Sequence, residues 1–322
     1  MENADLTLIP DRPLPLDQHP VAVYLSQLAP GSRRTMQGAL DTVARLLTGD
    51  RCSAIEMQWS ALRYQHTAAV RSMLMERYKP ATANKMLAAL RRALQEAHRL
   101  GQMSADDYAR AIDVPIVKSS GLLKGRALNL SEIMALMQIC AADTSPAGAR
   151  DAAIIAILYG CGLRRSELVK LNLADLNIGS GGLTIRGGKG RKDREVYLPQ
   201  GAIAAVADWV AVRGVEPGAL LCPIGKTGRL DIRSLSDQAI PKILARRAAA
   251  AGLQIDFTAH DFRRTFISDL FDRGIDVSTI QKMAGHSKPE TSIRYDRRGE
   301  EAKRNAANQL HVPHFQRRSP SP

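Results

Sequence analysis

One stretch of this sequence, "GGLTIRGGKGRKDREVYLP" at residues 181–199, differs from the segments on both sides of it. Two runs typical of strands, "LTIR" and "REVYLP", flank a turn rich in glycine and lysine, and this pattern predicts a β-hairpin. Apolar residues elsewhere recur mostly at helical spacing. A single hairpin among many helices indicates a mainly α fold with a small β-hairpin or sheet, of the α+β class.

Residues 20–115 are expected to form an all-helical domain. "PGSRRTMQGALDTVARLLTG" predicts a helix capped by Ser32 and ended by Gly49, and "HPVAVYLSQL", "TAAVRSMLMERY" and "SADDYARAI" predict further helices. The clearest helical pattern is "KPATANKMLAALRRALQEAHRLG", in which leucines form one apolar stripe. Lys85, Arg91 and Arg92 lie largely off that stripe. They are candidates for contacts with DNA phosphates, and a solvated helix face explains them equally well.

Shifts in composition divide the rest of the chain. Residues 1–19 are rich in proline and aspartate and predict an irregular N-terminal arm. Residues 116–127 read as a linker because they are rich in proline, serine, glycine and lysine and have no periodicity. A second domain is expected over residues 128–311, with Ser131 capping its first helix and mostly helical structure after the hairpin. Residues 312–322 are expected to form a disordered tail.

The charge balance of the chain predicts a polyanionic partner. The 322 residues have a formal net charge of +13, and residues 121–322 hold 30 of the 45 lysines and arginines against 20 of the 32 acidic residues. A generally basic surface is the alternative explanation. The four cysteines are scattered without a CxxC pair, which favours a reducing compartment and disfavours a zinc site. No signal peptide or long apolar run is evident, so we expect a cytoplasmic protein without membrane association.

The first motif with chemical content is "GCGLRRSELVKL". Arg164 follows a glycine turn, and Glu167 stands three residues later, on the same face at the start of a helix. A carboxylate in that place can orient a guanidinium group. An ordinary surface ion pair would have the same spacing.

The second motif is the turn of the predicted hairpin, "RGGKGRKDRE". Lys189 lies among glycines at the tip, where a mobile turn can present an ammonium group to a phosphate or a leaving oxygen. Arg191 and Lys192 add positive charge beside it, and the "GKG" context favours Lys189 over Lys192 for this role. The turn does not have the pattern of a nucleotide-binding P-loop.

The third motif is "TAHDFRRTF", in which His260 and Arg263 share one face of a helix. One group that can shuttle a proton and one rigid fork of donors suit two oxygens of a phosphate. A metal site is disfavoured because an arginine would repel the cation. A capping histidine beside an exposed arginine is the alternative.

The fourth motif is "AGHSKPETSIRYDRR". Gly285 is expected to end a helix just before His286, and Pro289 to begin the next helix, which carries Tyr295. Arg294 and its neighbours around Tyr295 are read as DNA-backbone contacts or solvated charge. A tyrosine among cations is either a surface residue or a nucleophile for a phosphate.

As a set, these motifs strongly resemble the tyrosine recombinase (phage integrase) family. The matching text is "GLRRSEL", "GGKGRKDR", "HDFRRTF", "AGHS" and a tyrosine nine residues after the histidine, which together cover residues 128–310. The helix "TANKMLAALRRALQEA" resembles more loosely the core-binding domain of that family. The resemblance implies a C-shaped DNA clamp of two domains, one helical and core-binding and the other catalytic.

The resemblance also implies a role for each candidate residue. Tyr295 would attack the scissile phosphate and form a 3′-phosphotyrosyl link, while Arg164 and Arg263 would hold the non-bridging oxygens. Lys189 would be the general acid for the 5′-oxygen. His260 would assist proton transfer, His286 would donate a hydrogen bond to the phosphate, and Glu167 would brace the site. Further DNA-binding candidates are Lys85, Arg91, Arg92, Arg191, Lys192, Arg264 and Arg294.

Finally, the resemblance implies no metal or nucleotide cofactor. It implies a homo-tetramer on two synapsed double-stranded DNA sites, exchanging strands through a Holliday junction, with an accessory DNA-bending protein or a partner recombinase as a further candidate. The 300–310 segment is expected either to pass to a neighbouring subunit or to dock on its own domain. The outcome would be integration, excision, transposition, or resolution of a replicon. A type IB topoisomerase and a non-catalytic DNA-binding relative are the alternatives.

Overall fold

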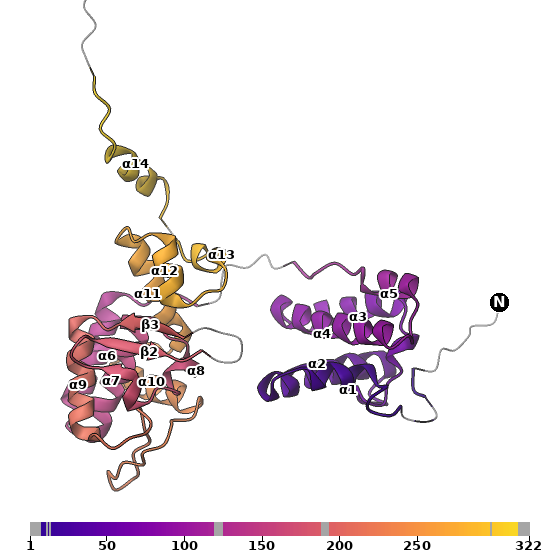
Figure 1. Ribbon diagram of the computed structural model, residues 1–322, viewed down its shortest axis with the longest axis horizontal. Helices are drawn as coiled ribbons and strands as arrows, with labels where there is room; N and C mark the ends of the chain where they lie inside the picture. Colours follow the sequence, from indigo (N-terminus) through magenta and orange to yellow (C-terminus); the bar gives the residue numbers. More distant parts are fainter. Residues whose placement is uncertain are drawn as a thin grey trace, which may run out of the picture. The chain divides into compact units, whose positions relative to one another are not determined.

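The computed structural model divides the chain into two compact units, residues 1–122 and residues 123–322 (Figure 1). The structure describes residues 8–10, 12, 14–118, 125–187, 193–296 and 298–314. Parts of the predicted arm, linker and tail, the tip of the predicted hairpin with Lys189, Arg191 and Lys192, and residues 315–322 therefore lie outside the described residues. None of the described helices is long and apolar enough to span a membrane.

The first unit is helical. Its helix α4 packs against α1, α2, α3 and α5 and buries Leu87, Leu90 and Leu94, the stripe that the sequence predicts. Its elements are α1 (Pro20–Ser26), α2 (Pro30–Thr48), the short 3₁₀ helix η1 (Trp59–Ala61), α3 (Tyr64–Arg77), α4 (Pro80–Arg99) and α5 (Ala105–Ile112).

The second unit is built around helix α7. Ten of its sixteen residues are buried, and it packs against α6, α9 and α11. The elements before α11 are α6 (Leu130–Ala142), α7 (Pro146–Cys161), α8 (Arg165–Leu168), η2 (Leu173–Asp175), β1 (Leu176–Asn177), β2 (Gly182–Ile185), β3 (Arg194–Tyr197), α9 (Gln200–Arg213) and α10 (Ala239–Ala250). The later elements are α11 (Ala259–Asp272), α12 (Val277–Ala284), α13 (Pro289–Ile293) and α14 (Glu300–Asn308).

The strands form one antiparallel sheet in the order β1-β2-β3. Leu183 of β2 pairs with Val196 of β3, and both side chains enter the core of the second unit. The predicted β-hairpin is thus confirmed. The sequence did not predict β1, because a strand of two residues has no detectable period.

Two predicted N-caps were wrong. Helix α2 begins at Pro30, with Ala29 as its N-cap, so Ser32 is not the cap; the predicted end at Gly49, in a left-handed conformation with φ of 62°, is confirmed. Helix α6 is capped by Asn129, which accepts a hydrogen bond from the amide of Glu132, and Ser131 lies inside the first turn. The part after the hairpin is mostly helical, as expected, with an irregular stretch at residues 214–238.

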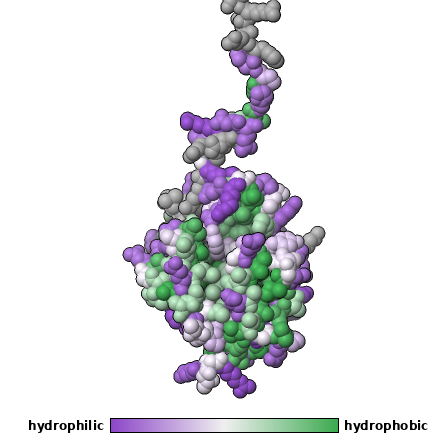
Figure 2. All heavy atoms as spheres, turned by 90° about the vertical axis from the view of Figure 1, so that its left-hand side faces the viewer, coloured by the Kyte–Doolittle hydropathy of each residue, from purple (hydrophilic) through white to green (hydrophobic). Residues whose placement is uncertain are grey.

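Figure 2 shows the face of the second unit on which α6 and α9 lie in Figure 1. Apolar patches alternate there with polar side chains. Leu130 and Met134 of α6 and Val212 of α9 are among the exposed large apolar residues of the chain. The polar clusters described below belong to other elements of this unit.

Candidate active site

The site begins where α7 ends. Gly162 takes the left-handed conformation with φ of 59°, and a Cβ there would overlap the ring of Phe266, so glycine is required by both backbone and space. The chain then turns into the short helix α8, with Arg164 at its N-cap. Glu167 accepts a hydrogen bond from the Arg164 amide at 2.9 Å and another from the Arg164 guanidinium at 2.7 Å. The predicted pairing of these two residues is therefore present.

Glu167 is a strongly stabilised anion. Burial alone would raise its pKa, but hydrogen bonds from Arg194 and Arg164 outweigh burial and lower the pKa to about 2. The carboxylate is therefore ionised near neutral pH, and it balances part of the positive charge of the site.

Helix α11 contributes His260 and Arg263. Thr258 caps this helix and shares a capping box with Asp261, which places His260 in the first turn. Arg263 is only 1% exposed and donates hydrogen bonds to the carbonyls of Gly162 and Ala284, at 2.8 and 2.6 Å. Burial and the charge of Arg164 lower its pKa to about 9. Arg263 therefore lies beneath the site rather than on an open surface.

The segment from α12 to α13 brings in His286 and Tyr295. Gly285 ends α12 with φ of 63° and Pro289 begins α13, as predicted. Helix α13 ends at Ile293 and Tyr295 lies in the turn after it, so the prediction that this helix carries Tyr295 was wrong. His286 is buried, its Nδ1 lies 2.7 Å from the hydroxyl of Ser292, and its ring is stacked near that of Tyr295, with 6.3 Å between ring centres. Burial and the charges of Arg263 and Arg164 lower the pKa of His286 to about 4.

The hydroxyl of Tyr295 lies 3.2 Å from Nε2 of His260. Loss of water around the His260 ring and the charge of Arg263 lower the pKa of this histidine, so its ring is neutral near pH 7. A neutral imidazole at hydrogen-bonding distance can accept the proton of a phenol. This pair, 35 residues apart in the sequence, is brought together by α11 and the turn after α13.

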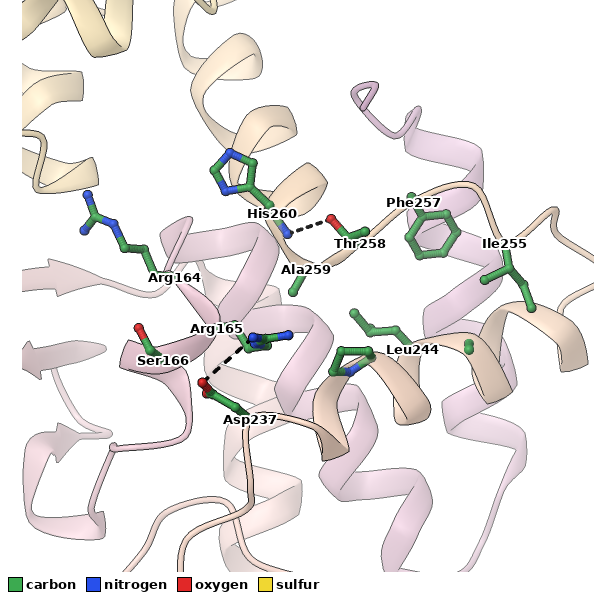
Figure 3. Close-up of a pocket in the computed structure, with 12 residues that line it drawn as sticks. Arg164, Arg165, Ser166, Asp237, Leu244, Ile255, Phe257, Thr258, Ala259 and His260 are labelled. Atoms are coloured by element: carbon green, nitrogen blue, oxygen red, sulfur yellow. Dashed lines mark hydrogen bonds and ion pairs between the residues drawn. The ribbon is translucent and has the colours of Figure 1, made fainter. Parts of the chain in front are cut away.

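Two pockets adjoin these residues. One of about 810 Å³ has Arg164 and His260 at its edge and Leu244, Ile255 and Phe257 along another wall, as Figure 3 shows. The other, of about 670 Å³, is lined by Glu167, Arg194, Gly285 and His286 among others. Arg164 lines both pockets and is therefore the cation of this cluster that is best placed to meet an anion.

The predicted DNA-binding residues differ in their surroundings. Lys85 and Arg294 are exposed. Arg91 donates to the carbonyls of Ile112 and Val114, and Arg92 interacts with Gln95, Glu96 and the ring of Tyr24.

Arg264 does not have the surface position that a DNA contact requires. It is 3% exposed, donates to the carbonyl of Gly125, and its guanidinium lies 5.7 Å from the centre of the Tyr295 ring. The sequence could not show this, because the partner Gly125 is 139 residues away in the chain.

Sequence reasoning missed Arg194. This residue begins β3, directly after the turn of the hairpin, and donates to both oxygens of Glu167 at 3.2 and 2.9 Å. No local spacing connects two residues that are 27 positions apart. The only signal was a basic residue at the start of a strand next to the lysine-rich turn.

Residues 126–301 match the model of the phage integrase family. The chain belongs to this family. It is 28% identical over 281 residues to the tyrosine recombinase XerC of Alcanivorax borkumensis, with 85% of this chain and 88% of that protein covered. It is 30% identical over 239 residues to the tyrosine recombinase XerA of Thermococcus kodakarensis, covering 74% of this chain and 79% of that one. The chain is a site-specific tyrosine recombinase, an enzyme that breaks and rejoins DNA.

Solved structures show the same fold at low identity. The Tn1549 transposon integrase in complex with transposon right-end DNA superposes with a TM-score of 0.68 at 15% identity, covering 90% of this chain and 99% of that one. The XerH site-specific recombinase, bound to a palindromic difH substrate in a post-cleavage complex, superposes with a TM-score of 0.64 at 18% identity, covering 93% and 98%. The mainly helical fold with one small sheet is thereby confirmed.

Proposed function

We propose that Tyr295 is the nucleophile that opens one DNA strand. Its phenolic oxygen forms a bond to the scissile phosphorus, the bond from phosphorus to the 5′-oxygen breaks, and a 3′-phosphotyrosyl link results. The observation that carries this proposal is the 3.2 Å separation between the Tyr295 hydroxyl and Nε2 of His260. Because the pKa of a free tyrosine is about 10, the nucleophile needs a neighbouring base, and neutral His260 is placed to receive the proton.

Arg164 and Arg263 are proposed to stabilise the charge that grows on the non-bridging oxygens. Guanidinium groups held in place before the reaction act at no reorganisation cost during it. Arg164 is 28% exposed on its side chain and borders both pockets, whereas Arg263 is closed off by α12. The proposal therefore requires Arg263 to exchange its contact with the Ala284 carbonyl for a phosphate oxygen when DNA arrives. His286, with its Nδ1 occupied by Ser292, would direct its Nε2 to the phosphate.

The departing 5′-oxygen needs a proton, and Lys189 is proposed as its donor. Lys189 lies outside the described residues, so its role rests on the sequence motif. Strands β2 and β3 carry the turn, and β3 is attached to the site by Arg194.

The phosphotyrosyl link keeps the energy of the phosphodiester, so a 5′-hydroxyl from a second strand can reverse the reaction without a nucleotide or a metal. Two such exchanges pass through a Holliday junction and use four subunits on two DNA sites. We propose α14 as a link between subunits, since its described side chains are exposed, as are Leu310 and Val312 just after it. The first unit is proposed to bind DNA beside the cleavage position.

Two observations weigh on the rival functions. The chain keeps Arg164, Arg263 and Tyr295, so a non-catalytic relative is disfavoured. The curated relatives are recombinases, which disfavours a topoisomerase; relaxation of supercoiled DNA that lacks a target site would nevertheless reveal that activity.

The test is covalent trapping on a nicked duplex. The site is first obtained by selecting, with the purified full-length protein, the fragments that it binds from the genome that encodes it. A nick beside the cleaved bond lets the short 5′-end diffuse away and leaves the protein attached to DNA. The wild-type chain should form this adduct, and Tyr295→Phe should not. Tyr197→Phe is a matched control, because Tyr197 is exposed on β3 and contacts Glu195. An adduct with Tyr295→Phe would refute the proposal.

A further inference from the structure

Three successive main-chain carbonyls at the end of α12 each accept a hydrogen bond from a different arginine. The contacts are Arg194 to Met283 at 3.3 Å, Arg263 to Ala284 at 2.6 Å, and Arg164 to Gly285 at 3.0 Å. The last carbonyls of a helix lack partners within the helix and carry partial negative charge. The end of α12 is therefore a point at which guanidinium groups from β3, α11 and α8 are assembled.

Arg194 has a second contact, in which both ends of its guanidinium group donate to Glu167. Its Nη1 and Nη2 donate to the two oxygens of Glu167, at 3.2 and 2.9 Å. The same two oxygens accept from the side chain and the amide of Arg164, at 2.7 and 2.9 Å. A guanidinium group that binds both oxygens of a carboxylate fixes the orientation of that carboxylate. The orientation that Glu167 presents to Arg164 is therefore fixed as well. Arg194 thus holds the Glu167 carboxylate in place, and this carboxylate in turn holds Arg164.

The packing around Arg194 allows little movement. A Cβ on Gly285 would come within 2.8 Å of the Cζ of Arg194, so the absence of a side chain at Gly285 makes room for this guanidinium. Arg194 is 18% exposed and Glu167 is 11% exposed. A residue so enclosed can hold its neighbours, but it presents little of itself to a ligand.

We propose that Arg194 is a positioning residue for DNA cleavage. Through Glu167 it sets the place of Arg164, and through Met283 it sets the end of α12, which carries His286. This inference rests on the proposed function, because Arg164 is taken there to meet the phosphate. It adds a residue from the hairpin strand to the set that controls the charge at the scissile phosphate.

The charges of the cluster fit this role. Arg164, Arg194 and Arg263 with Glu167 leave a net charge of +2 at the end of α12. A phosphodiester has one negative charge, and a second develops as the tyrosine oxygen adds to phosphorus. Loss of Arg194 would remove one positive charge and also allow Glu167 and Arg164 to rotate away. Both effects weaken the stabilisation of negative charge at the phosphate and leave the overall fold intact.

The experiment compares two nicked duplexes of the same sequence. One has an ordinary phosphate at the cleaved position, and in the other a methyl group replaces one non-bridging oxygen. The methylphosphonate is neutral and gains only one negative charge in the reaction, so it needs less help from cations. The rate of covalent adduct formation is measured on both duplexes with the full-length protein at saturating concentration.

For Arg194→Ala we expect a loss of about tenfold to a hundredfold on the phosphate and of less than about threefold on the methylphosphonate, somewhat below the cost of removing a direct oxyanion donor. Arg194→Gln is shorter than arginine and neutral but keeps two N–H donors, so it provides a second, polar variant if the alanine variant folds poorly. In an Arg164→Ala background, the further loss from Arg194→Ala should fall below about threefold, because the group through which it acts is already gone.

Arg246→Ala is the matched control. Arg246 belongs to the same unit and donates to Asp151 at 2.8 Å, in an ion pair that does not touch the site. This variant should cleave both duplexes at wild-type rates. Equal loss on the two duplexes in both Arg194 variants would show a merely structural role, and wild-type rates on both would show no role at all. Either result overturns the inference.

Failure of the proposed function would look different. If the wild-type chain forms no adduct with the phosphate duplex, or forms one that survives in Tyr295→Phe, the function is wrong whatever the Arg194 variants do. If the wild-type chain reacts through Tyr295 and the Arg194 variants show no difference between the duplexes, only the inference fails.

Discussion

Arg263 and Arg247 are both almost completely buried in the second unit, yet their pKa values are shifted in opposite directions. Burial by itself would lower both. At Arg247, hydrogen bonds to Asp143 and Asp151 outweigh burial and raise the pKa. At Arg263, the hydrogen bonds go to main-chain carbonyls, and burial together with the charge of Arg164 lowers the pKa to about 9. Two buried arginines therefore serve different purposes.

The cluster around Arg247 has one carboxylate more than the cluster around Glu167 and connects α7 to α10. Asp151, fully buried, accepts hydrogen bonds from Arg150, Arg246 and Arg247, and Asp143 accepts another from Arg247. Three guanidinium groups and two carboxylates leave a charge of +1. The cluster around Glu167 has three arginines and one carboxylate, and Arg164 in it borders two pockets. The excess positive charge of this second cluster is stabilised by main-chain carbonyls rather than by carboxylates, so it remains available to an anion.

The largest expected effect is on the cluster around Asp151 and Arg247. Asp151→Ala would leave Arg150 and Arg247 buried without their common carboxylate, and removal of one partner from such a pair costs about 3–5 kcal/mol. The free energy of unfolding in urea should fall by this amount. The activity of the molecules that remain folded at low temperature should stay at the wild-type value. A loss below about 1 kcal/mol would mean that water or a rearrangement replaces the carboxylate.

The next effect is on chemistry rather than stability. Arg263→Ala should lower the rate of adduct formation by about 10²–10³-fold, the cost of one oxyanion donor, while binding to the site at moderate salt persists. Arg247→Ala is the matched variant. It should destabilise the fold yet leave the rate per folded molecule unchanged. If the two variants lose the same amount of rate, or if Arg263→Ala loses DNA binding as well, the distinction between the clusters is wrong.

A third, smaller effect concerns acid. The pKa of His286 is about 4 in the folded chain and about 6.5 in an unfolded one. The unfolded chain therefore binds more protons between these values, and stability falls as the pH drops from about 6.5 to about 4. His286→Asn keeps a polar group near Ser292 but cannot titrate. Its unfolding free energy should change by about 2 kcal/mol less than that of the wild type between pH 7 and pH 4.5. If the wild type and His286→Asn lose the same unfolding free energy between pH 7 and pH 4.5, His286 is not held neutral.

The sequence predicted the set of residues that the fold gathers, and it did so through motifs with local spacing. Arg164 and Glu167 lie three residues apart, as do His260 and Arg263, and such pairs share a helix face in any fold. Only the family resemblance predicted that these pairs lie close together in the folded chain. The roles of the six candidates remain predictions, and Lys189 lies outside the described residues.

What the sequence could not predict depends on contacts between distant segments. Arg194 reaches Glu167 because β3 packs beside α12, and nothing in "REVYLP" indicates that neighbour. Arg264 was expected on the surface because arginines usually are exposed, and its burial follows from Gly125 and the Tyr295 ring. The cap of α6 was misplaced by two residues because Asn129 and Ser131 are both good caps, and Glu132 selects Asn129 by completing the capping box.

The smallest expected effect concerns the first unit, where an exposed cation can be compared with a cation that is bound to main-chain carbonyls. Lys85 is exposed, whereas the guanidinium of Arg91 is used by the carbonyls of Ile112 and Val114. If the first unit binds DNA, Lys85→Ala should reduce the slope of log affinity against log salt by about one, because one phosphate contact releases about one counterion. Arg91→Ala should leave that slope unchanged and lower the stability of the unit. Titration of the selected duplex at several salt concentrations separates the two, since a cation that already serves backbone carbonyls has no counterion to release. A reversed result, with the slope reduced only by Arg91→Ala, would mean that this helix offers DNA a different face.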